Sequence, residues 1–331
     1  MKEAMVSDAP SVIPRRGYFY VILAALFWAV SGSSGKFLFK GGVTPMELVQ
    51  MRVTLSAAVL FVYLLLTNRA CLVISRRDIL YFGVLGTVGM AMVQFTYFYS
   101  ISKIHVAAAI LLQYLAPAFI ALHAVLIARE RLARATVLAV AGSLAGCYLV
   151  VGAYNLNVVA MNWKGIAAGI AAGLSFAWYA VHGERGMRRY HPWTVVFYAL
   201  LFAALFWNIA LPPFQAFRRP YSPVQWTWIL YIAVLGTVVP YGLYSLGINL
   251  IRSTRASITA TLEPITAALI SFLFLGETLE PLQVLGGAVV IASVIVLQTR
   301  REYDENTPAV IRSRAAASGG DLPGREERKV G

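Results

Sequence analysis

The amino-acid sequence predicts an all-α integral membrane protein whose ten transmembrane helices form two inverted five-helix repeats. Three observations predict this fold: the composition, the spacing of long apolar runs, and a self-similarity of the chain in constant register. The 331 residues are 59% hydrophobic and 13% charged, with a mean hydropathy of +0.69. Soluble globular chains carry about 25% charged residues, so this chain needs lipid to cover its apolar surface.

Ten apolar runs are long enough to cross a bilayer, which takes about 20 mostly apolar residues. They lie near residues 18–39, 45–66, 79–101, 104–128, 134–152, 165–183, 193–212, 226–248, 254–275 and 282–299. The polar end of the chain, rich in Gly, Ser and charge, is typical of disorder. The expected organisation is a cytoplasmic segment over 1–16, a first repeat over 17–155, a second, inverted repeat over 162–299 and a disordered cytoplasmic tail over 300–331.

The basic residues predict the orientation. With the N-terminus placed in the cytoplasm, 16 Lys and Arg residues flank the runs on the inner side and 6 on the outer side, leaving out the distal tail. The positive-inside rule therefore predicts a multi-pass protein of the cell inner (cytoplasmic) membrane with both termini cytoplasmic. The net charge of +13 is scattered between apolar runs, which argues against nucleic-acid binding. Cys71 and Cys147 have no neighbouring His/Cys cluster, so we expect no disulfide framework, metal site or cofactor.

The chain matches itself after a shift of about 147 to 150 residues. The phrase "LYFGVLGTV" at 80–88 corresponds to "LYIAVLGTV" at 230–238, and Pro117 corresponds to Pro264. Each copy holds five runs, an odd number, so the second copy must enter the membrane from the opposite side. Inverted repeats are the usual architecture of secondary transporters, with the binding site near the midplane between the repeats.

The second copy reads "LEPITAALISFLFLGETL" at 262–279, while the first copy has Arg129 where this pattern has glycine. Together with Trp28, Lys36 and Arg52 in the first two runs, these residues resemble the EamA-type branch of the drug/metabolite transporter superfamily over roughly residues 17–299. The resemblance implies a ten-helix carrier of small metabolites, commonly an exporter, without a nucleotide-hydrolysing domain. It also implies a cavity lined by the first, third, fourth, sixth, eighth and ninth helices.

Glu263 and Pro264 interrupt the ninth run near its middle. A charge at that depth costs roughly 2.5–3.5 kcal/mol and usually faces a cavity or a partner. Glu263 is therefore either a hydrogen-bonded glutamate that stabilises a kink or a substrate or proton site. Pro264 removes a backbone donor and frees a carbonyl one turn earlier, near Ala260. His123, in the fourth run, is expected to bond a neighbouring helix or to relay a proton.

Gating or structural roles are predicted for a second group of residues. Pro117 and Pro264 are expected to bend their helices, while Glu130 and Glu277 lie at helix ends, where a carboxylate accepts backbone donors. Arg52 enters the apolar part of the second run and needs a partner or a water-filled vestibule.

Polar and aromatic side chains recur at helical spacing in the third and eighth runs. Gln94 and Tyr97 correspond to Tyr241 and Tyr244 under the repeat, which leaves both a packing and a cavity interpretation open. Gln113 lies one turn before a proline, and two tryptophans lie in mid-helix, where aromatic faces can hold apolar or cationic ligands. The predicted substrate-binding residues are Trp28, Gln94, Tyr97, Gln113, Trp178, Tyr241, Tyr244 and Glu263.

These observations lead to one functional hypothesis and two alternatives, an enzyme and a channel. The hypothesis is a monomeric secondary transporter that exports amino acids or related small amphiphilic metabolites by alternating access, with a proton as the candidate coupling ion. The first alternative is a membrane-embedded enzyme acting on a lipid-soluble substrate. It would need a nucleophile–base or metal constellation, and the sequence contains neither HExxH nor GxSxG. A channel would ordinarily use oligomeric symmetry, whereas this chain carries its symmetry internally.

Overall fold

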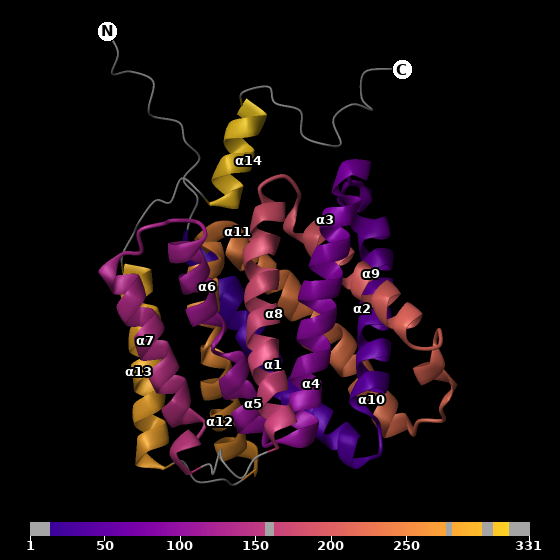
Figure 1. The fold of residues 1–331 in the computed structure, drawn as a ribbon, viewed down its shortest axis with the longest axis horizontal. Coiled ribbons are helices and arrows are strands. Elements are labelled where there is room, and N and C mark those ends of the chain that lie inside the picture. Colours follow the sequence, from indigo (N-terminus) through magenta and orange to yellow (C-terminus); the bar gives the residue numbers. More distant parts are fainter. Residues whose placement is uncertain (1–13, 156–161, 276–279, 300–306, 318–331) are drawn as a thin grey trace.

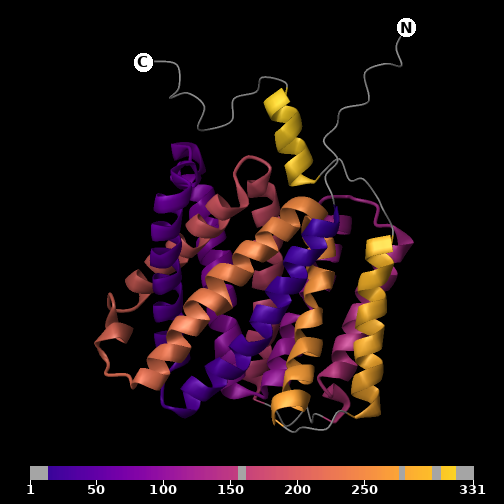
Figure 2. The same cartoon turned by 180° about the vertical axis from the view of Figure 1, so that it is seen from behind.

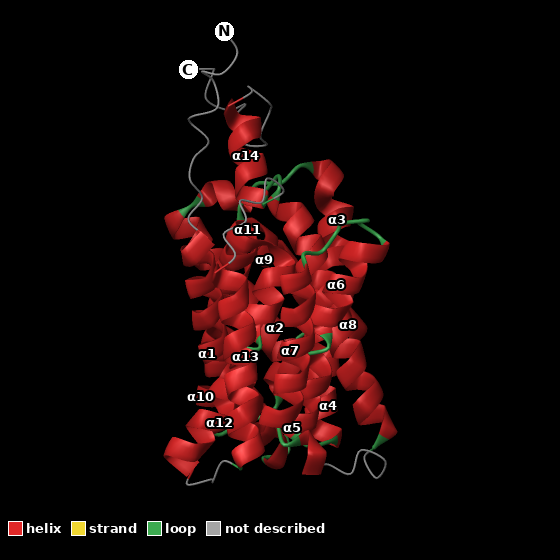
Figure 3. Cartoon of the chain, turned by 90° about the vertical axis from the view of Figure 1, so that its left-hand side faces the viewer, coloured by secondary structure: helices red, strands yellow, loops and turns green. Residues whose placement is uncertain are grey.

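The computed structural model describes residues 14–155, 162–275, 280–299 and 307–317, and Glu277 therefore lies outside the described residues. Within this part of the chain the regular structure is helical, with no strand (Figure 3). The first half contains α1 (Pro14–Lys40), α2 (Pro45–Thr67), α3 (Ile79–Val84), η3 (Leu85–Ala91), α4 (Met92–Lys103), α5 (Val106–Gln113), α6 (Ala116–Leu126) and α7 (Arg134–Val150). The second half contains α8 (Trp163–Met187), α9 (Pro192–Ala210), α10 (Pro223–Ala233), η7 (Val234–Val238), α11 (Val239–Ala260), α12 (Leu262–Leu275) and α13 (Pro281–Thr299), followed by α14 (Pro308–Ala317).

The start of α2 is fixed by hydrogen bonds between residues that are close in the sequence. Thr44 Oγ1 accepts a hydrogen bond from the Glu47 N–H at 3.2 Å, and Glu47 Oε2 accepts one from the Thr44 N–H at 2.7 Å. This reciprocal pair satisfies two backbone donors that have no partner inside the helix. Pro45 is the first helical residue, where a missing N–H costs nothing.

The two copies of the repeated phrase adopt the same irregular form. Both η3 and η7 are π-helical, and each contains most or all of the shared "VLGTV". A π-helical turn departs from the α pattern of backbone hydrogen bonds and is frequent at functional sites. The same five-residue phrase therefore forms a π-helical turn at two places about 150 residues apart.

The two prolines of the fourth and ninth runs lie at the starts of helices. Pro117 is the second residue of α6, which follows a break after α5, and Pro264 is the third residue of α12, which follows the end of α11. The expected bend at each proline is thus replaced by a break in the helix just before it. The reason is that the first turn of a helix tolerates proline, whereas a helix interior does not.

Seven helices of the described residues are long and apolar enough to cross a membrane, and α7 and α13 are shorter apolar helices. One of the seven stretches, Pro223–Ala260, is 38 residues long and contains a non-helical residue, Arg252, with φ 66° and ψ 164°. The ribbon reverses direction within α11, so this stretch does not continue as one straight rod (Figure 2). Large apolar side chains such as Leu80 and Ile209, 78% and 84% exposed, cover the outside.

Helices from the two halves pack in pairs. α1 lies along α11, and α7 lies along α13 at one edge of the bundle (Figures 1 and 2). Gly146 of α7 faces Gly286 of α13 so closely that a Cβ on either glycine would lie 2.7–2.8 Å from the other's carbonyl oxygen. Backbones at this separation are typical of small-residue contacts between membrane helices.

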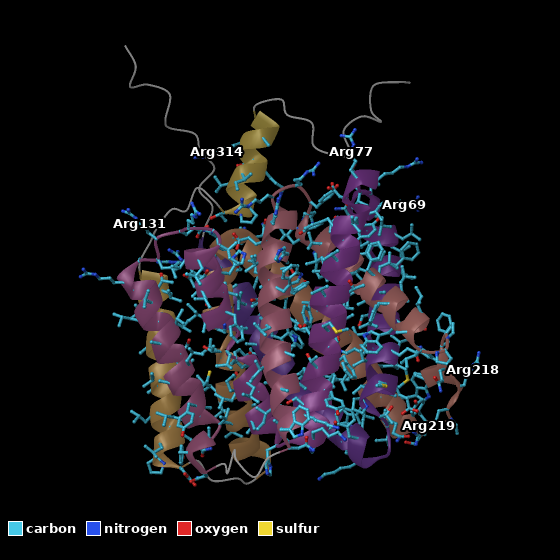
Figure 4. All side chains as sticks on the ribbon, viewed as in Figure 1. Arg69, Arg77, Arg131, Arg218, Arg219 and Arg314 are labelled. Atoms are coloured by element: carbon cyan, nitrogen blue, oxygen red, sulfur yellow. The ribbon has the colours of Figure 1, made fainter. Side chains whose placement is uncertain are left out.

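Arginine side chains lie at both ends of the bundle. Arg69, Arg77, Arg131 and Arg314 lie at the end that bears α14, here called the arginine-rich end, and Arg218 and Arg219 lie near the other (Figure 4). The helix α14 differs from the disorder expected over 300–331. Its Arg312 donates hydrogen bonds to Asn249 Oδ1 at 2.7 Å and to the carbonyl of Met187, contacts that no local pattern of the tail could reveal.

Candidate functional site

A small cavity inside the bundle, here called the central cavity, has a volume of about 20 Å³. That is room for about one water molecule. Residues of α1, α2, α4, α5, α11 and α12 line it, so both halves of the chain contribute. The lining residues are Trp28, Ser31, Arg52, Val93, Gln94, Tyr97, Gln113, Tyr241 and Glu263.

Glu263 is 5% exposed and contacts one phenol. Its Oε2 lies 2.7 Å from the Tyr114 hydroxyl, and the same hydroxyl donates to the Ala260 carbonyl at 2.8 Å. That carbonyl lies one turn before Pro264, where a freed acceptor was predicted, and Tyr114 supplies its partner. A phenol has a single proton. When Tyr114 donates it to Ala260, the contact with Glu263 is a hydrogen bond only if the carboxyl carries a proton.

Arg52 is 3% exposed and is anchored on the π-helical turn η7. Its Nε donates to Thr237 Oγ1 at 2.5 Å, and its Nη2 donates to the Gly236 carbonyl at 2.8 Å. The guanidinium also lies 5.0 Å from the centroid of the Phe98 ring. Arg52 therefore has the partners that its depth in the second run requires. Both hydrogen-bond acceptors come from the other half of the chain, whereas Phe98 belongs to the same half as Arg52.

Arg52 and Glu263 place a guanidinium and a carboxyl group at the central cavity. Both line it, and within the described part of the chain no direct ion pair joins them. A guanidinium has five donors, of which these hydrogen bonds engage Nε and Nη2. The cavity can therefore offer donors to an anionic group near Arg52 and acceptors to a cationic group near Glu263.

Two further polar atoms at the central cavity have no protein partner among the described residues. Ser31 Oγ and Gln113 Oε1 are buried and have no hydrogen-bond partner among the described residues, and both residues line the central cavity. Buried polar atoms are nearly always paired with protein or water. A small polar ligand, or water in its absence, would satisfy them.

An aromatic wall closes one side of the central cavity. The Trp28 ring packs edge-on against Tyr241, with centroids 5.1 Å apart, and against Phe176 at 6.0 Å. Tyr244 packs behind Trp28 at 5.4 Å, is fully buried and does not line the cavity. Of the predicted tyrosines, Tyr97 and Tyr241 therefore face the cavity, and Tyr244 supports the wall.

Trp178 lies elsewhere, contrary to its expected place in the pore. It is 38% exposed and stacks on His182, with ring centroids 3.8 Å apart. Successive residues of an α-helix are about 100° apart. Phe176 faces inward, so a side chain two residues later points to the opposite side of α8.

Val93 and Tyr114 are not among the residues predicted from the sequence. Ser31 begins the stretch "SGSSGK", whose small residues favour close helix approach or backbone contact with a substrate, but its side chain is not among the predicted site residues. Tyr114 lies three residues before Pro117, as Thr261 lies before Pro264, so its place at a helix break was readable. That its hydroxyl reaches Glu263, 149 residues away, was not.

Glu130 has a different partner from the backbone donors expected at a helix end. Its Oε1 forms an ion pair with Arg252 Nη2 at 2.7 Å. The preceding residue, Arg129, has φ 54°. This left-handed conformation favours glycine, and Arg129 adopts it without being one.

Comparison with known proteins gives two separate family matches. The EamA-like transporter family matches residues 15–152 and again residues 163–299. An uncharacterized transporter of Archaeoglobus fulgidus is 34% identical over 213 residues, which are 63% of this chain and 74% of that protein. The uncharacterized inner membrane transporter YicL of Salmonella typhimurium is 28% identical over 289 residues, 86% of this chain and 95% of that protein.

A relative with a named substrate matches a shorter stretch. The threonine/homoserine exporter RhtA of Escherichia coli is 30% identical over 151 residues, which are 44% of this chain and 50% of that protein. One crystal structure of a protein shares the fold with a TM-score of 0.69 at 21% identity, over 87% of this chain and 98% of that one. The relatives from Archaeoglobus fulgidus and Salmonella typhimurium are named as transporters and RhtA as an exporter. The chain is a multi-pass transport protein rather than an enzyme.

Proposed function

The chain belongs to the EamA-like transporter family, and from this premise we propose that it is a secondary carrier that exports amino acids by alternating access. It crosses the cytoplasmic membrane ten times and works as a monomer, with both termini and the arginine-rich end in the cytoplasm. The single observation that carries the substrate class is the presence of a guanidinium, Arg52, and a carboxyl group, Glu263, at the central cavity.

Several features support two inverted repeats. The family matches each half separately, and the two halves share π-helical turns at the same phrase and helix breaks just before the prolines. If α3 to α4, α5 to α6, α10 to the first part of α11, and the rest of α11 to α12 each count as one span, the helices amount to ten. The repeats meet at the central cavity, as expected of an inverted-repeat carrier.

A zwitterion matches the charges of the central cavity. The carboxylate of an amino acid would take donors from Arg52, because a guanidinium binds carboxylates through paired N–H groups. The ammonium would take Glu263 as its acceptor, and Trp28 and Tyr241 would cover the apolar part. RhtA, a relative of part of this chain, is named as a threonine and homoserine exporter, which supports the same class.

A volume of about 20 Å³ is too small for an amino acid, so loading requires the halves to separate. This supports alternating access, in which one repeat moves against the other around the site. Gating is assigned to the segments at Pro117 and Pro264 and to Glu130.

A proton is the proposed coupling ion. Glu263 would hold either the proton, which the Tyr114 contact accommodates, or the substrate ammonium, because one carboxyl cannot pair fully with both. Competition of this kind would couple proton entry to amino-acid exit.

The test is counterflow in proteoliposomes with radiolabelled threonine, with threonine amide and the decarboxylated amine as competitors. We expect threonine to exchange, and each analogue, which lacks the carboxylate charge, to compete poorly. Glu263→Gln should abolish exchange while membrane insertion stays normal. Glu47→Gln is the matched control, because Glu47 caps α2 away from the central cavity. Equal competition by all three compounds, or full exchange by Glu263→Gln across a range of pH, would refute the zwitterion site.

A further inference from the structure

A second cavity, of about 340 Å³, is lined by residues near the ends of α6 and α8. Both helices end toward the arginine-rich end (Figure 1). Three of its lining residues follow one another at intervals of four along the chain and become less exposed with depth. Ala128 is exposed, Ala124 is 7% exposed and Ile120 is 1% exposed. The cavity therefore has its mouth near Ala128 and its closed floor near Ile120.

Arg252 lines this second cavity and joins three segments of the chain. Its Nη2 donates to Glu130 Oε1 at 2.7 Å, just beyond α6, and its Nε donates to Glu184 Oε1 at 3.0 Å on α8. Glu184 Oε2 also accepts from the Ser253 N–H at 2.8 Å and from Ser253 Oγ at 2.6 Å. The side chains of Arg252 and Glu184 are 19% and 5% exposed, so solvent screens their contact weakly.

The two ion pairs differ in what they connect. Glu184 and Arg252 both belong to the second half of the chain, and Glu184 is additionally held by the backbone next to Arg252. Glu130 belongs to the first half and is 32% exposed at its side chain. The Arg252–Glu130 contact is thus the one that crosses between the halves, and the other contact holds the guanidinium in place for it.

The backbone at Arg252 is in a conformation that is almost confined to glycine. Its φ of 66° and ψ of 164° lie in a region that residues with a Cβ occupy only when their surroundings impose it. The two carboxylates and the reversal of the chain within α11 supply that constraint. Strain of this kind is concentrated in segments that switch between conformations.

We propose that Arg252 is a latch that closes the arginine-rich end of the carrier by holding Glu130 of the first half to Glu184 of the second. The inference rests on the alternating-access carrier proposed above and adds the residue that keeps one of its gates shut. When this end opens, the contact with Glu130 breaks, and the backbone at Arg252 is then able to leave its strained conformation. The ion pair and the reversal of α11 therefore change together, as expected of a two-state gate rather than a gradual deformation.

The latch is tested by the accessibility of a cysteine at the depth of Ala124. In the full-length protein, Ala124→Cys is combined with Glu130→Gln or with Arg252→Gly, and labelling by a small maleimide is timed in proteoliposomes. Both variants should label at least fivefold faster than Ala124→Cys alone. Arg252→Lys keeps the charge but loses the planar guanidinium that reaches two carboxylates. The labelling rate of Ala124→Cys with Arg252→Lys should therefore lie between those of Ala124→Cys alone and Ala124→Cys with Arg252→Gly.

Ala128→Cys in the same backgrounds is the matched control, because it lies at the exposed mouth and should label at one rate throughout. The native cysteines, Cys71 and Cys147, are buried. If Cys71 and Cys147 label faster in Arg252→Gly but not in Glu130→Gln, the Arg252→Gly protein has unfolded. The latch is then judged by Glu130→Gln, which leaves the Glu184 contacts intact.

The latch is overturned if Ala124→Cys in a folded Glu130→Gln protein labels within twofold of the rate of Ala124→Cys alone. It is also overturned if labelling is faster in a folded Arg252→Gly protein but not in Glu130→Gln. No amino acid is needed for this readout. If Ala124→Cys labels as expected but the protein does not exchange amino acids, the proposed substrate is refuted and the latch is still supported.

Discussion

Replacing Arg52 by lysine tests the central cavity most directly, because it keeps the charge and changes only the geometry. The guanidinium reaches Thr237 and Gly236 at 2.5 and 2.8 Å and still lines the cavity. A lysine ammonium is a single point that cannot hold both partners and also meet a ligand carboxylate. The substitution should therefore remove one charge-assisted hydrogen bond to the substrate.

The magnitude follows from that lost bond. A hydrogen bond to a charged group contributes about 1.5–3 kcal/mol, and each 1.4 kcal/mol corresponds to a tenfold change in affinity. We expect the half-saturating threonine concentration in counterflow to rise roughly 10- to 140-fold. Arg52→Ala, which also removes the charge, should raise the half-saturating threonine concentration at least as far.

The matched control is Arg219→Lys. Arg219 pairs with Glu47 at 3.3 Å near the other end of the bundle, and its side chain is 42% exposed. Exposed pairs of this kind contribute at most about 1 kcal/mol to stability, and Arg219 does not line the central cavity. The half-saturating threonine concentration should therefore not change. If Arg52→Lys and Arg52→Ala both stay within threefold of the parent protein, Arg52 does not bind the substrate carboxylate.

Three further predictions concern stability and local charge. Arg129→Gly should raise the free energy of unfolding in detergent by roughly 0.5–1 kcal/mol, because glycine adopts the left-handed conformation without steric cost; a lower unfolding midpoint would contradict this. Gly146→Ala should cost about 1–3 kcal/mol, because its Cβ would lie 2.8 Å from a carbonyl oxygen of α13. Gly287→Ala, whose Cβ would have one neighbour at 3.9 Å, should be nearly neutral, and equal midpoints for the two alanine variants would be inconsistent with the close contact. Burial, and then the charge of Arg312, lower the pKa of His191, so Arg312→Ala should raise that pKa toward its ordinary value in an NMR titration. Since the folded state disfavours the charged imidazole, acidification through the ordinary pKa should destabilise the parent protein more than the variant, and an unchanged pKa would show that α14 does not reach His191.

The helix breaks explain how an apolar bundle can hold polar chemistry in its interior. The ends of α5 and α11 leave backbone groups that the next helix does not satisfy, and the Tyr114 hydroxyl takes one of them at Ala260. The π-helical turn η7 leaves the Gly236 carbonyl as an acceptor for Arg52. Irregular backbone is tolerated at membrane depth where it is buried in protein or lines a cavity.

The sequence by itself determined what depends on local pattern. Composition and the lengths of the apolar runs predict a multi-pass helical protein, the repeated phrases predict equivalent local structure in both halves, and Pro264 predicts a free acceptor near Ala260. Only the tertiary structure decided which side chains meet. Tyr114 with Glu263 and Arg52 with Gly236 are 149 and 184 residues apart, and no periodicity carries that information. Trp178 faces outward because the rotation of α8 is set by packing, and α14 is held by the acceptors that Arg312 finds on α11 and at the end of α8. Hydrophobic spacing specifies that a helix forms and which stretch it occupies, whereas its rotation and its partners follow from the packing of all helices together.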